Sequence, residues 1–318
     1  MARQTTDATM AKLSVIVASD YAAGEAKSWE DLRRALRAWA EQEGLPADEF
    51  ILVESARFEG RIPNDVLGLV SNLKVLHVDA ESSYELKNRA VEAASGDWVA
   101  IVDADCIPSR SWLRVLRAAI AEHPDAAAVS ARTLYPGRSR LERILGLLSR
   151  SYLDPGRPGR TRFISGNAAA FRRDIYRRHP LPAGLGAFAS RIQSEAFLRE
   201  GARLWFEPEL VVVHDFEGWP MERDLRRNHG YSTVITRVRD ARLPYARLIR
   251  VGVPAIPLIV IGKTVDSIRD CFRCFRQYNV KLYELPLALA LTVVTHVLEI
   301  PGMWQAFRRK SIQATQFR

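Results

Sequence analysis

The first half of the chain alternates short apolar runs with longer segments whose apolar residues recur at helical spacing. Buried strands are expected at residues 13–18, 50–54, 73–78 and 98–103. Amphipathic helices are expected at residues 29–41, 84–94 and 109–121. This alternation predicts an α/β fold with a mostly parallel sheet and helices on both faces. Ligands of such sheets bind beyond the carboxyl ends of the strands.

The pattern changes after about residue 135. Residues 135–162 lack a clear period, and the Pro- and Gly-rich run at 154–160 predicts an irregular loop. A helix at 189–200 and two strands, 203–207 and 210–214, then return the chain to the sheet.

Two uncharged apolar segments, 251–262 and 285–298, stand near the carboxyl terminus. Each is shorter than the roughly 20 residues that span a bilayer. A basic segment, 263–281, separates them, and basic residues prefer the cytoplasmic side. We therefore expect a helical hairpin that dips into the inner leaflet. The alternative is a pair of ordinary core helices, which prolines would interrupt at Pro254, Pro257, Pro286 and Pro301.

Composition narrows the class of protein. Hydrophobic residues make up 47% and charged residues 26% of the 318, which excludes wholesale disorder. The 46 basic residues exceed the 37 acidic ones, which indicates an anionic partner. Three cysteines form no disulfide framework, and the first residues lack the apolar core of a signal peptide, so we expect a cytoplasmic location for the bulk of the chain.

The most informative motif closes the fourth expected strand. Asp103 and Asp105 are separated by one residue at the point where the strand ends. Such a carboxylate pair can hold Mg²⁺ or Mn²⁺ and, through it, a diphosphate. No GxGxxG or GxxxxGK[ST] loop is present, which weakens a dehydrogenase or P-loop assignment.

The surroundings of this motif resemble family 2 glycosyltransferases of the GT-A fold over roughly residues 12–230. The resembling segments are LSVIVASD from Leu13, FILVES from Phe50, the Lys87-Asn88 pair, SGNAAAFRR from Ser165 and EPELVVVH from Glu207. The expected fold is therefore GT-A, Rossmann-like, with a C-terminal α-helical membrane-associating segment. The expected domains are residues 1–245 for catalysis and 246–318 for the membrane-associating region.

The resemblance implies roles for individual residues. Asp105 and His214 would bind the metal, Gly166 and Asn167 would lie on the acceptor side, and the nucleotide-sugar would contact Ser19, Glu54, Lys87, Asn88, Asp103 and Arg227. Arg227 belongs to a basic run with Arg223, Arg226 and His229. That run could contact a diphosphate or an anionic acceptor, or be a solvated helix face.

Two departures from the family pattern stand out. The first strand runs Ala18-Ser19-Asp20, where the family usually has Pro. Inverting members carry a Glu-Asp pair, whose Asp is the general base, at the start of the helix before the EP strand. An ungapped count places Ala189-Ser190 there, whereas a helix one turn shorter would place Ser194-Glu195 there. Glu195 is the candidate base, and a solvated helical glutamate is the alternative.

The resemblance predicts an inverting, metal-dependent hexosyltransferase. It would move a sugar from a nucleoside-diphosphate-sugar to a lipid-linked or envelope-glycan acceptor at the cytoplasmic membrane face. Two other functions stay open: a non-catalytic nucleotide-sugar-binding scaffold of the same fold, and a sugar nucleotidyltransferase. Nucleic acid is not an expected partner, because the basic residues form no RNP-like or helix-turn-helix signature.

Overall fold

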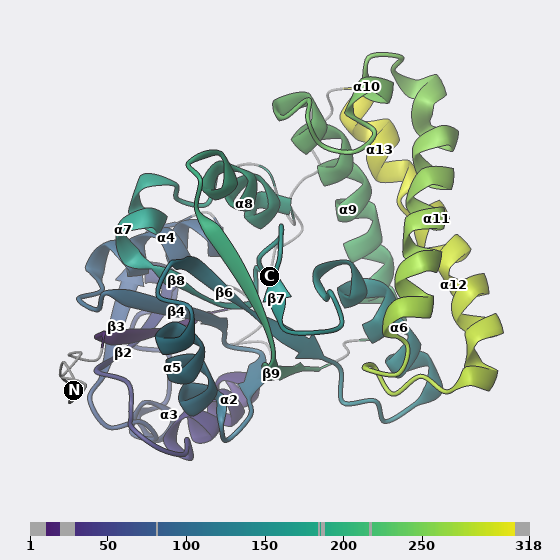
Figure 1. The fold of residues 1–318 in the computed structure, drawn as a ribbon. Coiled ribbons are helices and arrows are strands. Elements are labelled where there is room, and N and C mark those ends of the chain that lie inside the picture. The colour runs from purple at the N-terminus through teal and green to yellow at the C-terminus, as the bar shows by residue number, and fades with distance from the viewer. Residues whose placement is uncertain are drawn as a thin grey trace, which may run out of the picture.

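A twisted sheet with a parallel half and a mixed half organises the first two thirds of the chain (Figure 1). The computed structural model describes residues 11–19, 29–80, 82–183, 185, 188–215 and 218–308. The parallel half has the order β3-β2-β1-β4 and comprises β1 (Leu13–Ala18), β2 (Glu49–Ser55), β3 (Leu73–Val78) and β4 (Trp98–Asp103).

The mixed half continues from β4 in the order β8-β6-β9-β5. Its strands are β5 (Cys106–Pro108), β6 (Ala126–Leu134), β8 (Ala168–Arg172) and β9 (Arg203–His214), with β7 (Gly159–Arg160) paired to β9. β8 runs antiparallel to β4 and β6, and β5 runs antiparallel to β9. The expected α/β fold is confirmed, and the strands at 203–207 and 210–214 are one continuous strand.

Helices cover both faces of the sheet because successive strand residues point to opposite sides. Val15 and Val17 of β1 join the core cluster beneath α2 (Glu30–Ala40) and α5 (Trp112–Glu122). Ile16 and Ala18 join the cluster beneath α4 (Ser83–Ala93) and α8 (Ala189–Arg199). The short helices α3 (Asn64–Leu67) and α7 (Arg173–Arg178) complete the two layers.

The segment expected to be irregular, 135–162, contains the helix α6 (Arg140–Arg150). The Ser139 hydroxyl accepts a hydrogen bond from the Glu142 amide, and the Glu142 carboxylate accepts one from the Ser139 amide, so a capping box starts this helix. Ile144, Leu145, Leu147 and Leu148 bury its apolar face. The expectation of a loop was wrong here because the Pro and Gly residues on both sides obscured an 11-residue helix with a clear start signal.

Four long or tightly packed helices stand beside the sheet domain at the carboxyl-terminal end (Figure 1). They are α9 (Trp219–Arg239), α11 (Ile256–Cys274), α12 (Leu285–Val297) and α13 (Ile300–Phe307), with the short α10 (Ala246–Ile249) between α9 and α11. α9 and α13 cross at two glycines. A Cβ atom on Gly230 would lie 1.9 Å from the Glu299 carbonyl oxygen, and one on Gly302 would lie 1.8 Å from that of Arg227.

The prolines of this region begin helices rather than interrupt them. Pro257, Pro286 and Pro301 each occupy one of the first two positions of α11, α12 and α13, and Pro254 lies in the short 3-10 turn Val253–Ala255. Proline is well tolerated at a helix start because the amide nitrogens there have no intrahelical acceptor. The proline argument against packed helices was therefore wrong.

Helices α11 and α12 expose many apolar side chains. Exposed fractions of 40–59% are found at Leu258, Ile261, Val265, Phe272, Leu287, Val293, Val294 and Val297. α12 also buries the polar residues Thr292, Thr295 and His296 beside Leu285 and Ala288. Among the described residues, the helical stretch Leu282–Phe307 is long and apolar enough to cross a membrane, although 39% of its most apolar window is buried in the protein.

Candidate active site

The pairing of β5 with β9 brings the DxD motif to His214. Asp103 ends β4, the chain turns at Ala104-Asp105, and Cys106 of β5 stands opposite His214 at the end of β9. This register places His214 Nε2 3.1 Å from Asp105 Oδ2. Two residues 109 positions apart in the sequence thus share one site at the carboxyl end of the sheet.

The His214 ring is fixed in orientation by its other nitrogen. Nδ1 lies 2.7 Å from the Asp215 carbonyl oxygen, so it carries the proton and donates it. The Tyr135 ring stacks on the imidazole, with the ring centroids 5.8 Å apart. Nε2 is therefore directed at Asp105, which is how a metal-binding histidine is commonly held.

Asp103 has a different partner. Lys87 of α4 is buried, and its Nζ lies 2.7 Å from Asp103 Oδ1 and 2.8 Å from the Gly166 carbonyl oxygen. The helix α4, the end of β4 and the loop before β8 therefore meet at one ammonium group. This contact neutralises Asp103 from the protein side.

The two carboxyls of the motif are electrostatically unequal. Burial raises the pKa of Asp103, and the neighbouring Asp105 adds to the rise against the opposing charge of Lys87. Burial also acts to raise the pKa of Asp105, but the His214 ring outweighs it and holds that pKa below its usual range. Burial lowers the pKa of His214, but Asp105 raises it, and the net result is a raised pKa. The Asp105–His214 pair is thus the position at which a metal cation would replace a proton.

The donor set fits a divalent cation. The ligand atoms of Asp105, Cys106 and His214 all lie within 4.8 Å of one another. The 3.1 Å between carboxylate oxygen and imidazole nitrogen is the span expected of two adjacent ligands at about 2.1 Å from an ion. Burial and Asp105 raise the pKa of Cys106, so its thiol keeps the proton and the carboxylate and the imidazole are the available ligands.

Ser19 and Glu54 also meet, at the carboxyl ends of β1 and β2. Ser19 Oγ donates a hydrogen bond to Glu54 Oε2, and the Ser19 amide donates to the Val53 carbonyl oxygen over 3.0 Å. Both side chains are buried. Asp20 belongs to the Ala18-Ser19-Asp20 end of the first strand, where the sequence departs from the family pattern, and it lies outside the described residues.

Three predicted residues have other contacts. Asn88 binds the backbone of Leu181 through both ends of its amide and accepts from the Tyr176 hydroxyl, so it ties α4 to the loop after α7. Asn167 supports the motif from behind, since its backbone oxygen accepts from the Asp103 amide. Arg227 lies apart from these groups: it is exposed, and its Nε donates to Gln305 of α13 over 3.3 Å.

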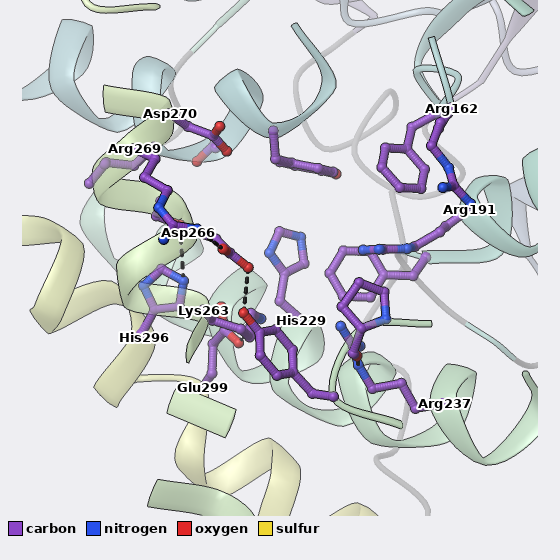
Figure 2. Close-up of a pocket in the computed structure, with 18 of the residues that line it drawn as sticks. Arg162, Arg191, His229, Arg237, Lys263, Asp266, Arg269, Asp270, His296 and Glu299 are labelled. Carbon is purple, nitrogen blue, oxygen red and sulfur yellow. Dashed lines mark hydrogen bonds and ion pairs between the residues drawn. The ribbon is translucent and has the colours of Figure 1, made fainter. Parts of the chain in front are cut away.

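Glu195 lines a cavity between α8 and the carboxyl-terminal helices (Figure 2). Its carboxylate is 11% exposed and lies 3.3 Å from Arg162 Nη2. Helix α8 begins at Ala189, so Ala189-Ser190 occupies its first turn and the helix is not shortened. Glu195 therefore reaches the cavity from the second turn of the helix.

Arg150 is a residue of this site that the sequence did not reveal. It ends α6, and its charge helps to lower the pKa of Asp105. Its guanidinium carbon lies 6.0 Å from the centre of the Tyr135 ring, and its Nε is buried without a hydrogen-bond partner among the described residues. Because α6 itself was not expected, no pattern in the sequence pointed to this cation.

Comparisons with known proteins agree with this geometry. Residues 23–179 match the family model described as "Glycosyl transferase family 2". No curated protein matches the chain. The mannosyltransferase PcManGT from Pyrobaculum calidifontis, solved in complex with GDP-Man and Mn²⁺, is similar with a TM-score of 0.62 and 16% identity, over 96% of this chain and 89% of that one.

A second similar structure is GalNAc-T7, solved with UDP, GalNAc and Mn²⁺. Its TM-score is 0.51 at 14% identity, and the match covers 76% of this chain and 53% of that one. At these identities both likenesses concern the fold, which they identify as that of nucleotide-sugar glycosyltransferases.

Proposed function

Since the chain belongs to glycosyl transferase family 2, we propose that it is an inverting enzyme that transfers a sugar from a nucleoside-diphosphate donor to a lipid-linked or envelope-glycan acceptor. The observation that carries this proposal is the Asp105–His214 pair, 3.1 Å apart at the carboxyl end of the sheet. Ligands of open α/β sheets bind at that edge.

Asp105 and His214 are the residues that would hold Mg²⁺ or Mn²⁺. When bound, such an ion neutralises the charge that develops on a departing diphosphate. The Nδ1 proton that His214 donates to the Asp215 backbone leaves Nε2 available as a ligand. Lys87 contacts Asp103 from the protein side and would hold this carboxylate in place beside the donor.

The donor would lie along the edge formed by β1, β2 and β4. Ser19 and Glu54 stand at the ends of β1 and β2, where the nucleotide base would bind, and Asp103 would bind the ribose or share the metal. Arg150 places a positive charge on the same side as Asp105, where the diphosphate carries its negative charge.

The transfer step needs a base for the acceptor hydroxyl. We propose Glu195 for this role: the hydroxyl oxygen bonds to the anomeric carbon, its proton passes to the carboxylate, and the bond from that carbon to the diphosphate oxygen breaks. Displacement from the face opposite the diphosphate inverts the anomeric centre. Support comes from the place of Glu195 in the cavity wall, with Arg162 beside it.

The acceptor would be approached from a membrane. Both α11 and α12 carry an outward stripe of exposed apolar side chains, and α12 in addition buries Thr292, Thr295 and His296, which is unusual for a water-soluble helix. Leu258, Ile261 and Phe272 recur on one face of α11 at exposed fractions of 55–59%. This surface supports association of residues 246–318 with the inner leaflet, with the catalytic residues 1–245 on the cytoplasmic side.

A thermal-shift panel of UDP-, GDP- and dTDP-sugars, each with and without Mn²⁺, tests the donor site. Ligand at a hundredfold excess over its dissociation constant stabilises the folded state by about 2.7 kcal/mol. We expect a Mn²⁺-dependent shift with one nucleotide class, lost in Asp105→Asn and kept in the surface control Asp125→Asn. Equal shifts in both variants would contradict the metal role of Asp105, and no shift with any donor would contradict the proposed function. The anomeric configuration of the product, read by NMR, tests inversion.

A further inference from the structure

The cavity that Glu195 lines has a volume of about 550 Å³ and lies between the catalytic domain and α9, α11 and α12 (Figure 2). Asp103, Asp105 and His214 do not line it, so it is separate from the candidate donor site. Arg150 connects the two, because its charge acts both on Asp105 and on Tyr152 in the cavity wall. Because the proposed base Glu195 lines this cavity, we assign it to the acceptor side of the site.

Eight cationic side chains line the cavity, against four carboxylates. Five of the cations each have an acidic partner among the described residues: Arg162, Arg226, Lys263, Arg269 and Arg273. Of the remaining three, Arg242 is exposed to solvent. The other two, Arg191 of α8 and Arg237 of α9, are not.

Arg191 and Arg237 have no carboxylate partner among the described residues. Arg191 has its guanidinium carbon 4.4 Å from the centre of the Phe163 ring, and its Nε is buried without a hydrogen-bond partner. Arg237 is 5% exposed and donates only to two backbone carbonyl oxygens, those of Pro244 at 2.5 Å and Thr233 at 2.9 Å. Figure 2 shows both, with Arg162, on the side of the cavity opposite Asp266 and Asp270.

The two guanidinium groups repel each other. Burial and, after it, the charge of Arg191 lower the pKa of Arg237 to about 10. Burial likewise lowers the pKa of Arg191, with a contribution from Arg162. Glu299 favours charged Arg237, but its carboxylate is already paired with Lys263. Both arginines stay charged at neutral pH, so the protein leaves two desolvated positive charges facing one space.

We propose that Arg191 and Arg237 bind a phosphate or diphosphate group of the acceptor in this cavity. Planar guanidinium groups bind phosphate oxygens through paired hydrogen bonds. A phosphate therefore suits two arginines that form no ion pair among the described residues better than a neutral sugar does. This inference rests on the proposed transferase function and names the chemical class of its acceptor: a molecule that carries a phosphoryl group near the hydroxyl presented to Glu195.

The remaining lining supports an amphiphilic acceptor. Leu148, Phe163, Phe188 and Tyr245 contribute apolar surface to the same cavity, which the outward apolar helices α11 and α12 flank. A lipid phosphate would place its head group between the arginines and its chain along these residues. A water-soluble phosphorylated glycan would use the arginines alone.

Calorimetric titration of the full chain in EDTA tests the proposal without a contribution from the metal-dependent donor site. The probes are octyl phosphate, inorganic pyrophosphate and the neutral amphiphile octyl glucoside. We expect the phosphates to bind, and Arg191→Gln and Arg237→Gln each to weaken that binding tenfold or more. Arg239→Gln, two positions away on the exposed side of α9, is the matched control and should leave the affinity unchanged. Arg191→Lys, which keeps the charge, should recover part of the loss.

Tighter binding of octyl phosphate than of pyrophosphate identifies a lipid-linked anion, and equal binding identifies a soluble one; both support the anion site. Octyl glucoside binding as tightly as octyl phosphate would overturn the proposal, as would unchanged phosphate affinity in both glutamine variants. The Mn²⁺-dependent donor shift of the unaltered chain is measured in parallel. If the donor shift is present and phosphate binding is absent, this inference fails alone, whereas loss of the donor shift rejects the proposed function itself.

Discussion

Glu49 offers a direct test of how buried polar contacts hold the sheet together. Its side chain is 6% exposed and accepts hydrogen bonds from Ser14 Oγ at 2.6 Å, from the Ser95 amide at 2.9 Å and from Lys74 Nζ at 2.7 Å. Burial alone would raise the pKa of Glu49, but these contacts outweigh it and lower the pKa from 4.5 to about 2. One carboxylate thus joins β1, β2, β3 and the turn that leads into β4.

The size of the effect follows from the pKa. Each pKa unit corresponds to about 1.4 kcal/mol, so ionised Glu49 stabilises the folded state by about 3 kcal/mol, an upper value because exposed Lys74 is screened by salt. Since the folded pKa is the lower one, this stabilisation is complete above pH 4.5 and is lost as the pH falls toward 2. Glu49→Gln should therefore lower the free energy of unfolding by about 3 kcal/mol at pH 7 and by much less near pH 2.5.

Urea unfolding followed by tryptophan fluorescence at pH 7 and pH 2.5 measures both values. Glu43→Gln, an exposed neighbour on the loop before β2, is the control and should match the unaltered chain at both pH values. A deficit of the same size at both pH values would refute the reasoning, because it would show that shape and not charge carries the effect. Unchanged stability of Glu49→Gln at pH 7 would refute it as well.

Three further predictions concern the site, the membrane-facing surface and the helix crossing. His214→Ala should raise the Mn²⁺ concentration that gives a half-maximal donor thermal shift by tenfold or more, and an unchanged midpoint would exclude His214 as a ligand. Ile261→Asp combined with Phe272→Asp should lower liposome flotation at least tenfold with little change in the thermal midpoint, since both side chains are more than half exposed; undiminished flotation would place the membrane contact elsewhere. Gly302→Ala should destabilise the protein by about 1–3 kcal/mol in thermal unfolding, because the new Cβ meets the Arg227 carbonyl, and wild-type stability would contradict such close packing.

Local sequence signals predicted the parallel half of the sheet well. The bounds of β1, β3 and β4 agree with expectation to the residue; β1 and β4 are short apolar runs buried on both faces, whereas β3 is only partly buried at the edge of the sheet. α6 was missed even though Ser139 and Glu142 form a capping box, since the Pro- and Gly-rich flanks dominated that segment. The hydrophobic period alone could not reveal a helix that lies between two irregular segments of the chain.

The candidate site was predictable in part for a different reason. Neither Asp105 nor His214 is informative alone, and in the sequence only the resemblance to a family links the two residues. In the structure, the register of β5 against β9 places them side by side. Arg191 and Arg237 illustrate the opposite case. They are two among many arginines in the sequence, and within the described part of the chain they stand out because neither forms an ion pair with a carboxylate, which only the assembled helices α8 and α9 reveal.

The glycine crossing of α9 and α13 bears on how the enzyme can be produced. A shortened protein ending near residue 245 would remove the apolar helices, but it would also strip Lys263 and Glu299 from the cavity and uncover the Gly230 surface of α9. Arg237 would then face bulk solvent, and water would hydrate its charge. Such a fragment could retain donor hydrolysis while losing acceptor affinity. Purification of the intact chain in detergent or lipid nanodiscs is therefore the route that preserves both halves of the reaction.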